Sequence, residues 1–512
     1  MLAEKGPLAQ RRLGAMPAHG PRSVAPQLAA APQLAAALTM PRFLLLAALI
    51  AIGAMAARYA ADTDTWWHMA TGRWIVAHGA LPAYDVFSHT QAGADWRIPG
   101  WPAQLLLYAI HSLAGDLGLA ALAALTVAAT FAIVAAATAG EQPFVRVIAL
   151  IFAAVVSSIY WAARPALFSL LFAALYLWLL REPTRRRTWL LVPTIMTLWA
   201  NTHGGFAIGF ILIGLALGGH GLRWLLGRAE ADRVAVVSLA GIGLLGALAA
   251  MVNPYGAEML AYPFKTVGLA ALGPYIQEWQ PPDLTAPLGQ AFLAWVISAC
   301  LVAALSWRRA NLPAVVIFLG ATALAFSAAR NVPLAAMAGV PVFVTGLAAL
   351  LERLLGARAA ALGTRPGSPA LNTALLVAVC ALAVVRWLAS STPAALPLDS
   401  AMRPPSTAVA TLRAEALPGP LFNSYDFGGY LIWALPEQPT FIDGRTDLYP
   451  TALFQDYVTI ENGGQTALEM LRRYGVRTAL VRSNSPAATA LAGSDSWRKV
   501  FSDDVAAVFT LR

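Results

Sequence analysis

Residues 43–68 read FLLLAALIAIGAMAARYAADTDTWWH, an apolar run that ends in two aspartates, two tryptophans and a histidine. The apolar part, 43–61, has the length of a transmembrane helix, which needs about 20 residues. Ionisable groups at a membrane boundary are costly to desolvate and usually mark function. The stretch therefore predicts a membrane anchor that delivers Asp62, Asp64 and His68 to one membrane surface.

Two simpler interpretations of this stretch stay open. Tryptophans suit headgroup depth, so the cluster could be an aromatic belt followed by a solvated loop. The Ala-rich end of the apolar run also looks like a signal-peptidase site. We favour an uncleaved anchor, because the run is long and the acidic cluster follows it directly.

The composition indicates a polytopic membrane protein. Of the 512 residues, 58% are hydrophobic and 12% are charged, whereas soluble domains carry about 25% charged residues. Mean hydropathy is +0.62. The net charge of +9 does not indicate nucleic-acid binding, because the basic residues form short runs between apolar segments, as expected of cytoplasmic loops. Cys300 and Cys380 lack CxxC spacing, which argues against a disulfide or a zinc site.

Eleven apolar segments have approximately the length of a membrane span. They are 41–61, 117–139, 145–162, 165–181, 188–202, 204–222, 233–252, 288–306, 312–329, 333–350 and 370–390. Trp101–Leu113 is also apolar but short, and we expect it to lie flat on the outer surface. If it crossed the membrane, the Arg-rich run 181–187 and every later basic loop would fall outside, against the positive-inside rule.

This topology predicts a cytoplasmic N-terminus and an extracytoplasmic C-terminus. Residues 1–40 are rich in Ala and Pro and predict a disordered cytoplasmic tail, followed by a transmembrane domain over 41–391 with an outer loop at 62–116. This topology places several polar groups on the outer side, although the positive-inside rule did not use them to assign the topology. They are Arg164-Pro165, Asn201-Thr-His203, Asn253-Pro-Tyr255-Gly256, Glu278-Trp279 and Arg330-Asn331. Helix caps and breaks would explain each one singly, but not their convergence on one side.

The outer loop carries the first candidate site. Residues 65–78 predict a helix, in which Asp64 and His68 are four apart and share a face. With Asp62 they could hold a metal ion, since carboxylates suit Mg²⁺ or Mn²⁺ and the histidine tolerates Zn²⁺. The alternative is an intrahelical ion pair with an N-cap from Asp64 or Thr65. Asp85 and His89, in the turn-rich segment that follows, are further candidates against a default of solvated loop residues.

Residues 392–512 change in character and predict a small α/β domain outside the membrane. The expected strands are Pro420–Asn423, Thr440–Ile442, Thr478–Val481, Lys499–Ser502 and Ala506–Thr510, and the expected helices are Phe454–Glu461, Thr466–Tyr474 and 486–493.

Two strings in this domain are candidates for ligand contact. The pair Gly428-Gly429 would let the backbone approach another group closely. Asp443 and Arg445 follow the expected strand at 440–442, a usual ligand position in α/β folds. The alternative is a DG turn with a local Asp–Arg pair.

Seven segments together resemble a group of bacterial membrane proteins that is similar to GT-C glycosyltransferases, the polytopic enzymes that use polyprenyl-phosphate-linked sugars. The segments are DTDTWWHMATGRWIVAHGALPAYDVFSHT (62–90), WANTHGGFAIG (199–209), NPYG (253–256), IQEWQPP (276–282), ARNVPL (329–334), FNSYDFGGYLIW (422–433) and FIDGRTDLY (441–449). The resemblance extends over roughly 41–512. The chain departs from the group at Pro99-Gly100, where a His-Glu pair is common.

The GT-C resemblance implies a catalytic carboxylate in the first outer loop, here Asp64 with Asp62 beside it. It implies transfer of a sugar from a polyprenyl-phosphate donor to a glycan, lipid or protein acceptor, at the outer face of the bacterial inner membrane in the cell envelope. Arg164 and Arg330 are then candidates to bind the donor phosphate.

Five further residues are candidates for substrate binding. Asp64 would be the general base, Asp62 and His68 would position it or hold the metal ion, and a single displacement would invert the anomeric centre. The substrate-binding candidates beside His68 are His203, Glu278, Asp85, Asp443 and Arg445. The alternatives are a flippase or transporter of lipid-linked glycans, or a non-catalytic membrane scaffold. Against a transporter, the sequence shows no internal repeat.

Overall fold

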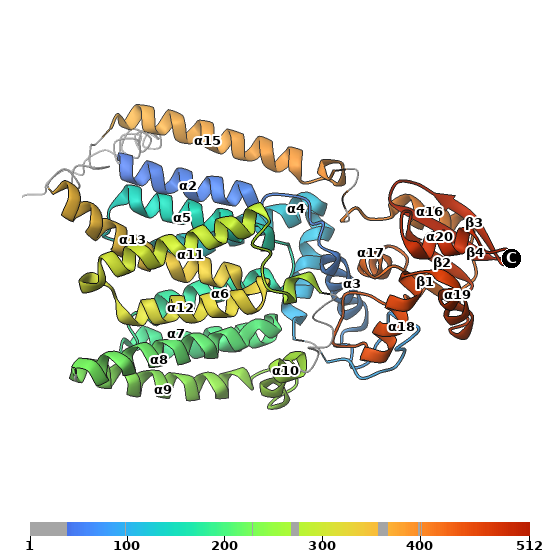
Figure 1. Ribbon diagram of the computed structural model, residues 1–512, viewed down its shortest axis with the longest axis horizontal. Coiled ribbons are helices and arrows are strands. Elements are labelled where there is room, and N and C mark those ends of the chain that lie inside the picture. The colour runs from blue at the N-terminus through green and yellow to red at the C-terminus, as the bar shows by residue number, and fades with distance from the viewer. Residues whose placement is uncertain are drawn as a thin grey trace, which may run out of the picture.

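The computed structural model describes residues 38–97, 99–227, 229–267, 276–356, 367–397, 400 and 402–512. The tail expected over 1–40 lies almost entirely outside the described residues. A bundle of long helices forms one end of the molecule, and a smaller domain with a sheet, built from the C-terminal residues, forms the other (Figure 1). Helices α3 (Thr63–His78) and α17 (Tyr425–Ala434) lie where the two parts meet.

Each of the eleven expected spans corresponds to a helix of the described chain, and the protein is a multi-pass membrane protein. Seven helical segments are long and apolar enough to cross a membrane. They are formed by α4 (Trp101–Ala136), α5 (Pro143–Ser157) with η1 (Ser158–Tyr160), η2 (Gly204–Phe206) with α8 (Ala207–Gly227), α9 (Glu230–Ala250), α11 (Pro287–Leu305), η6 (Ala329–Asn331) with α13 (Val332–Leu355), and α15 (Pro369–Ser390). Three shorter apolar helices are α2 (Met40–Ala56), α6 (Ala166–Leu179) and α12 (Leu312–Ser327). The eleventh, α7 (Arg186–Thr202), has 17 residues and begins with two arginines.

The helix expected at Trp101–Leu113 is present as the first part of α4, up to the break at Gly115. It continues into the next span as α4, a 36-residue helix interrupted only at Gly115, which has φ 56° and ψ −148°. Glycine adopts this backbone conformation without the Cβ strain that other residues would suffer. The division predicted between 101–113 and 117–139 therefore coincides with this break, and the flat orientation of the first part stays a prediction.

The C-terminal domain is built on a four-stranded mixed sheet with the order β1-β2-β4-β3. Its strands are β1 (Leu421–Asn423), β2 (Thr478–Arg482), β3 (Trp497–Ser502) and β4 (Ala506–Leu511), and its helices are α16 (Ser406–Ala414), α17, α18 (Thr451–Glu461), α19 (Gly464–Arg473) and α20 (Pro486–Ala492). Strand β1 pairs in parallel with β2, while β4 runs antiparallel to both β2 and β3. Short helical elements elsewhere are α10 (Glu258–Val267), η4 (Gln277–Trp279), η5 (Trp307–Arg309) and η7 (Pro393–Ala395).

Of the eight elements expected in this domain, seven are confirmed, and two helices, α16 and α17, were not expected. Thr440–Ile442 is not a strand: Thr440 makes an isolated bridge to Ser88 of the outer loop instead. The segment that contains the glycine pair is the helix α17, which the alternation of strands and helices did not predict.

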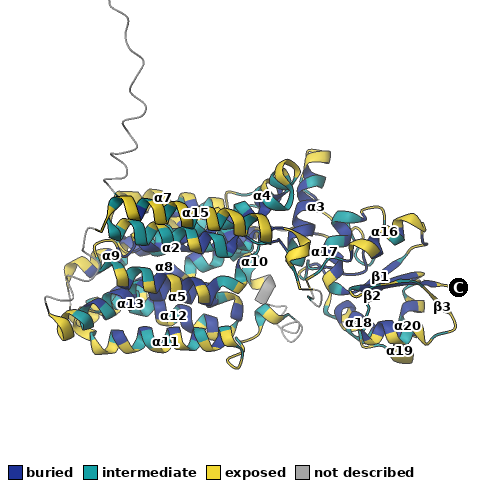
Figure 2. Cartoon of the chain, turned by 90° about the horizontal axis from the view of Figure 1, so that it is seen from above, coloured by how far each residue is buried: buried dark blue, intermediate teal, exposed yellow. Residues whose placement is uncertain are grey.

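The two parts of the molecule share a hydrophobic core. Trp67 and Ala70 of α3, together with Trp96 of the outer loop, are buried in the same cluster as Phe441 and Tyr449 of the C-terminal domain. Figure 2 shows buried residues continuing from the bundle through α3 and α17 into the sheet. The outer loop thus folds as part of the C-terminal domain and not as an independent segment.

Candidate active site at the junction of the two parts

Three carboxylates at the junction surround one arginine. The guanidinium of Arg164, just before α6, donates from Nη1 to Asp64 Oδ2 at 2.8 Å, and its Nε lies 3.5 Å from Asp62 Oδ2. Its Nη2 donates to Glu278 in η4. Segments from three places in the sequence therefore meet in one cluster, which we call the acid–arginine cluster. Its four side chains keep between 16% and 32% of their surface exposed, so they are accessible to a ligand.

The start of α3 fixes the orientation of the two aspartates. Asp62 is the N-cap, and its Oδ1 accepts the backbone N–H of Asp64 at 2.9 Å. The prediction that Asp64 or Thr65 caps this helix was therefore wrong by two or three residues. Asp64 points to the cluster, where its Oδ1 accepts a hydrogen bond from the Trp67 indole at 3.0 Å. A short polar residue satisfies the free N–H groups at a helix start, which explains why Asp62 occupies this position.

The electrostatics distinguish Asp64 from Glu278. Burial, followed by the charge of Asp62, raises the pKa of Asp64 to about 7, although Arg164 and the Trp67 hydrogen bond oppose the shift. Burial also acts to raise the pKa of Glu278, but Arg164 and Arg330 outweigh it and leave this pKa below its ordinary value. A carboxylate with a pKa near the working pH is suited to proton transfer, and Asp64 meets this condition.

The predicted metal site is not assembled by these residues. Within the described ranges, no three His, Cys, Asp or Glu residues lie together in a way that could hold a metal ion. Asp62 and Asp64 face the Arg164 guanidinium, which already supplies a cation between them. His68 is turned away: its Nδ1 lies 3.3 Å from the Gln104 amide nitrogen, and its ring packs on Trp67. The set Asp62, Asp64 and His68 therefore does not fit a metal ion in this arrangement.

Arg330 provides a second cation beside the cluster. Its guanidinium lies over the Trp279 ring, 5.2 Å from the centroid, and the side chain is exposed. No carboxylate of the described chain lies within 4.0 Å of it, whereas Arg164 is engaged by three. The charge of Arg330 influences the pKa of Glu278, which places it near the same group.

Two glycines bring the C-terminal domain against α3, and a third lets two segments of that domain approach each other. A Cβ added at Gly444 would lie 2.2 Å from Asp64 Oδ1, and one at Gly429 would lie 2.1 Å from the Thr63 carbonyl oxygen. A Cβ at Gly428 would lie 2.3 Å from the carbonyl oxygen of Ile442. The prediction that the glycine pair allows close backbone approach is confirmed. The domain thus closes directly over the carboxylate of Asp64.

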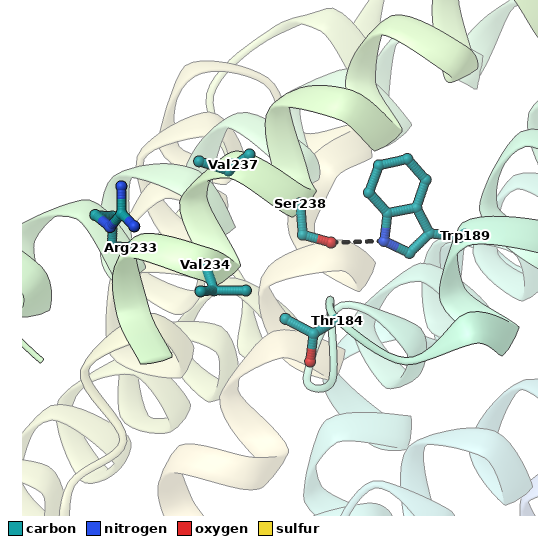
Figure 3. Close-up of a pocket in the computed structure, with 6 residues that line it drawn as sticks. All are labelled: Thr184, Trp189, Arg233, Val234, Val237 and Ser238. Atoms are coloured by element: carbon teal, nitrogen blue, oxygen red, sulfur yellow. Dashed lines mark hydrogen bonds between the residues drawn. The ribbon is translucent and has the colours of Figure 1, made fainter. Parts of the chain in front are cut away.

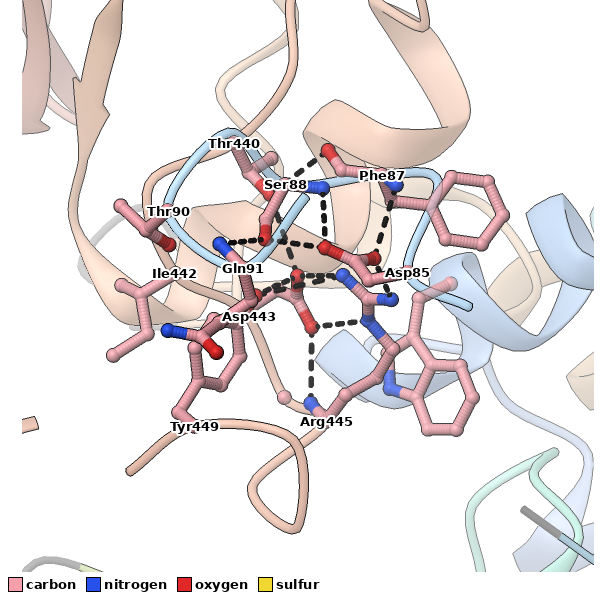
Figure 4. A network of polar contacts seen from close by, with 12 residues as sticks. Asp85, Phe87, Ser88, Thr90, Gln91, Thr440, Ile442, Asp443, Arg445 and Tyr449 are labelled. Atoms are coloured by element: carbon pink, nitrogen blue, oxygen red, sulfur yellow. Dashed lines mark hydrogen bonds and ion pairs between the residues drawn. The ribbon is translucent and has the colours of Figure 1, made fainter. Parts of the chain in front are cut away.

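Asp85, Asp443 and Arg445 form a fully buried network next to this contact (Figure 4). Arg445 donates to Asp85 at 2.5 Å and to Asp443 at 2.7 and 2.8 Å, and Tyr449 also donates to Asp443. The guanidinium lies over the rings of Phe87 and Trp96. Since neither partner of either ion pair has exposed side-chain surface, this position favours a role in holding the outer loop and the C-terminal domain together.

Sequence reasoning missed several polar groups at the junction. The Tyr262 hydroxyl of α10 donates to Asp447 at 3.3 Å, and its ring lies where a Cβ of Gly204 would be, 2.5 Å from the nearest ring carbon. Tyr425 and Thr446 share a hydrogen bond of 3.0 Å. Asp447 could have been singled out as the second acid of the DGRTD string, but Tyr262 lies in an ordinary apolar segment that carries no such signal.

Two of the sequence motifs have structural partners. Asn201 accepts a hydrogen bond from the Trp101 indole at 3.2 Å and donates to the Val252 carbonyl oxygen at 2.8 Å. Asn253 closes a turn on itself by accepting from the Tyr255 N–H. These contacts tie the ends of α4, α7 and α9 together.

Two hollows in the bundle lie away from this junction. One, of about 390 Å³, lies between α7 and α9, where the Trp189 indole donates to Ser238 at 2.7 Å (Figure 3). The other, of about 170 Å³, lies among the ends of several helices and is lined by Glu141, Arg181 and His220 among others. Neither is lined by a residue of the acid–arginine cluster.

Among solved structures, the chain is similar to the archaeal oligosaccharyltransferase AglB from Archaeoglobus fulgidus. The apo form gives a TM-score of 0.54 at 13% identity, over 86% of this chain and 69% of AglB. The complex with an inhibitory peptide and a dolichol-phosphate gives 0.52 at 13% identity and the same coverage. The complex with Zn and sulfate gives 0.51 at 14% identity, over 86% and 68%.

A further similarity is to ArnT from Cupriavidus metallidurans bound to undecaprenyl phosphate, with a TM-score of 0.47 at 14% identity, over 91% of this chain and 97% of ArnT. No protein-family model matches the sequence, and no curated protein matches it either. The similarity to AglB establishes the fold: a helical membrane domain of the GT-C type with a small C-terminal domain that contains a sheet.

Proposed function

We propose that this protein is a membrane glycosyltransferase that moves a sugar from a polyprenyl-phosphate donor to a hydroxyl group of a glycan, lipid or protein acceptor. The observation that carries the proposal is Asp64: a partly exposed carboxylate with a pKa of about 7, located where a membrane bundle meets its C-terminal domain. The fold supports it, since AglB is an oligosaccharyltransferase whose structure was determined with a dolichol-phosphate. We place the reaction at the outer face of the bacterial inner membrane.

Asp64 acts as the general base. Each of its oxygens already holds one partner, Trp67 on Oδ1 and Arg164 on Oδ2, and a carboxylate oxygen can accept a second hydrogen bond. The acceptor hydroxyl gives its proton to Asp64 as its oxygen attacks the anomeric carbon. The bond from that carbon to the phosphate oxygen breaks, the polyprenyl phosphate leaves with the bonding electrons, and the configuration inverts. Asp64 then releases the proton to solvent.

The two arginines have different roles in this proposal. Arg164 is engaged by Asp62, Asp64 and Glu278, so it orients the base and holds η4 in place. Arg330, an exposed residue with no ion-pair partner in the described chain, binds the donor phosphate. Guanidinium groups match phosphate geometry and pair with two of its oxygens.

The remaining candidate residues either contact the acceptor or hold other residues of the site in position. Asp447 of the C-terminal domain is exposed and accepts from half-buried Tyr262 of α10 across the junction, and we assign both residues to the acceptor. Asp85, Asp443 and Arg445 are positioning residues: they keep Gly444 against Asp64 and do not touch the substrate.

The rate is expected to fall on the acidic side of pH 7. The base must be ionised to accept a proton, and with a pKa of about 7 the ionised fraction of Asp64 drops about tenfold per pH unit at lower pH. The measurement is kcat/KM for the donor between pH 5 and pH 9. A profile that stays flat down to about pH 5, as for a carboxyl with an ordinary pKa of about 4, contradicts the assignment.

Gly444→Ala is expected to lower kcat by about 10²-fold, because an added Cβ would meet Asp64 Oδ1 at 2.2 Å and displace the base. Gly493→Ala is the matched control, since its Cβ would find its nearest neighbour at an ordinary 3.5 Å. Both variants are assayed for transfer and for thermal unfolding. Equal transfer rates in the two variants would show that the segment Asp443-Gly444-Arg445 does not position Asp64.

Arg330→Ala is expected to raise KM for the donor by about 10–100-fold, the loss of one hydrogen-bonded ionic contact. The KM of Arg330→Lys should lie between that of the unaltered protein and that of Arg330→Ala, because lysine keeps the charge but lacks the planar guanidinium. Arg308→Ala serves as control, since Arg308 lies over Trp307 in a similar stacking arrangement on η5, outside the junction. If only kcat changes in Arg330→Ala, the residue does not bind the donor.

The proposed function is tested with the purified full-length protein in phosphatidylcholine nanodiscs. Polyprenyl-monophosphate sugars are offered with a solubilised envelope extract as acceptor, in Mg²⁺ and in EDTA, and released polyprenyl phosphate is measured. Asp64-dependent release supports the transferase. If no donor releases its lipid phosphate although lipid binding is intact, the protein is not a transferase of this class, and movement of lipid-linked glycans across vesicles becomes the next measurement.

A further inference from the structure

His203 has its ring orientation and its proton position fixed by neighbours. It lies between α7 and η2 in extended backbone, and its Nδ1 accepts the N–H of Gly205 at 3.0 Å. A backbone N–H can only donate, so this nitrogen must offer a lone pair. Ser169 of α6 lies on the same nitrogen, with its Oγ 2.8 Å away.

The direction of the serine hydrogen bond follows from the Gly205 N–H, and the contact with Trp199 is compatible with it. The Trp199 indole, which is fully buried and can only donate, gives its N–H to Ser169 Oγ at 2.7 Å. Since that donor occupies a lone pair of Oγ, the hydroxyl hydrogen is free to point at His203 Nδ1. Because the Gly205 N–H donates to Nδ1, this nitrogen carries no proton, and the Ser169 hydroxyl therefore donates to it as well.

The imidazole is therefore the neutral tautomer with its proton on Nε2. Burial, followed by the charge of Arg164, lowers the pKa of His203 to about 3, so the ring stays neutral at any physiological pH. Arg164, Glu278 and Arg330 are the charged groups that act on it, which places the ring beside the acid–arginine cluster. No residue in the described ranges accepts a hydrogen bond from Nε2.

We propose that Nε2–H of His203 is an uncharged hydrogen-bond donor to the lipid phosphate that Arg330 pairs with, and that Ser169 and Trp199 are its positioning residues. This inference rests on the proposed function. A phosphate oxygen only accepts hydrogen bonds, and this tautomer only donates at Nε2. The neutral imidazole of His203 also adds no positive charge beside Asp64. A further cation there would stabilise the ionised carboxylate and make Asp64 a weaker base.

The glycine after the histidine supports the arrangement. A Cβ added at Gly205 would lie 2.7 Å from His203 Nδ1 and 2.8 Å from Ser169 Oγ. Any larger residue there would separate the hydroxyl from the ring. The segment from Trp199 to Gly205 thus contains the indole that donates to Ser169, the imidazole of His203 and the glycine that leaves room for it. Ser169 itself comes from another helix, α6.

The first experiment measures binding of a polyprenyl monophosphate, without a sugar, to the full-length protein in phosphatidylcholine nanodiscs. His203→Asn, which lacks a donor at the Nε2 position, should weaken binding by about 10–100-fold. His203→Gln, whose amide N–H reaches approximately that position, should stay within a few-fold of the unaltered protein. Ser169→Ala should weaken binding less than His203→Asn, and Ser298→Ala, a helical serine bonded only to the Trp295 carbonyl, should not change it.

The second experiment reads the tautomer directly by ¹⁵N NMR of histidine-labelled protein, with His203→Gln used to assign the signal. The expected spectrum between pH 5 and pH 8 has a protonated Nε2 and an unprotonated Nδ1. A proton on Nδ1, or equal binding by the Asn and Gln variants, overturns the proposal. Neither readout needs turnover, so a failed transfer assay with intact phosphate binding counts against the proposed function and not against this donor.

Discussion

Asp64→Asn is expected to lower kcat by about 10²–10⁴-fold, the usual contribution of a general base. The amide has nearly the size of the carboxylate and can still accept from Trp67, but it cannot take the proton of an acceptor hydroxyl. The fold should not weaken at neutral pH. A carboxyl whose pKa is raised in the folded state loses stability as the pH rises through that pKa, so a neutral side chain avoids this cost above pH 7.

Asp95→Asn is the matched control for this substitution. Asp95 lies in the same outer loop, is 70% exposed and makes only a loose pair of 3.9 Å with Arg97. It should leave both transfer and thermal unfolding unchanged. Full activity in Asp64→Asn at normal protein levels would remove Asp64 from the mechanism.

Arg445→Ala is expected to produce the largest loss of stability, about 3–5 kcal/mol. The change leaves the carboxylates of Asp85 and Asp443 buried without their cation, since all these side chains are fully buried. The apparent unfolding temperature of the purified protein should fall by about 3–5 °C. Transfer should fall with it, because Gly444 precedes Arg445 and rests on Asp64.

Arg413→Ala is the control, since its pair with Glu437 is exposed on both sides and is worth less than about 1 kcal/mol. Asp85→Asn is a milder test of the same network, because Arg445 keeps its contacts with Asp443. Arg445→Ala with the stability and activity of the unaltered protein would show that the network does not hold the outer loop to the C-terminal domain.

Most of the membrane bundle could be predicted from the sequence, because a helix in lipid satisfies its backbone hydrogen bonds within one segment. The break at Gly115 agrees with the predicted division between 101–113 and 117–139. The strand expected at 440–442 was wrong. Strand pairing depends on partners far away in the chain, and Thr440 pairs with Ser88 of the outer loop.

The sequence predicted which residues form the candidate site better than it predicted how they contact one another. Asp62, Asp64, Arg164 and Glu278 do come together, since charged groups between membrane spans must share the little polar space that exists there. Asp62, Asp64 and His68 are not gathered as a metal site in the described chain, because Arg164 lies beside both carboxylates and His68 Nδ1 lies next to Gln104. Asp443 and Arg445 belong to a buried ion network. The sequence did not predict this burial, because a DG turn does not reveal which of its sides other segments will cover.

The sequence by itself determined the class of protein, the order of its helices and the carboxylate that follows the first of them, because these depend on hydropathy and on neighbours along the chain. Only the tertiary structure decided that Gly444 rests on Asp64, that Arg164 is engaged by three acids while Arg330 is open, and that Ser169 and Gly205 fix the proton of His203. Distances of 2–3 Å between groups far apart in the chain set the pKa of a base and the tautomer of a histidine. Such distances follow from packing, which no local pattern encodes.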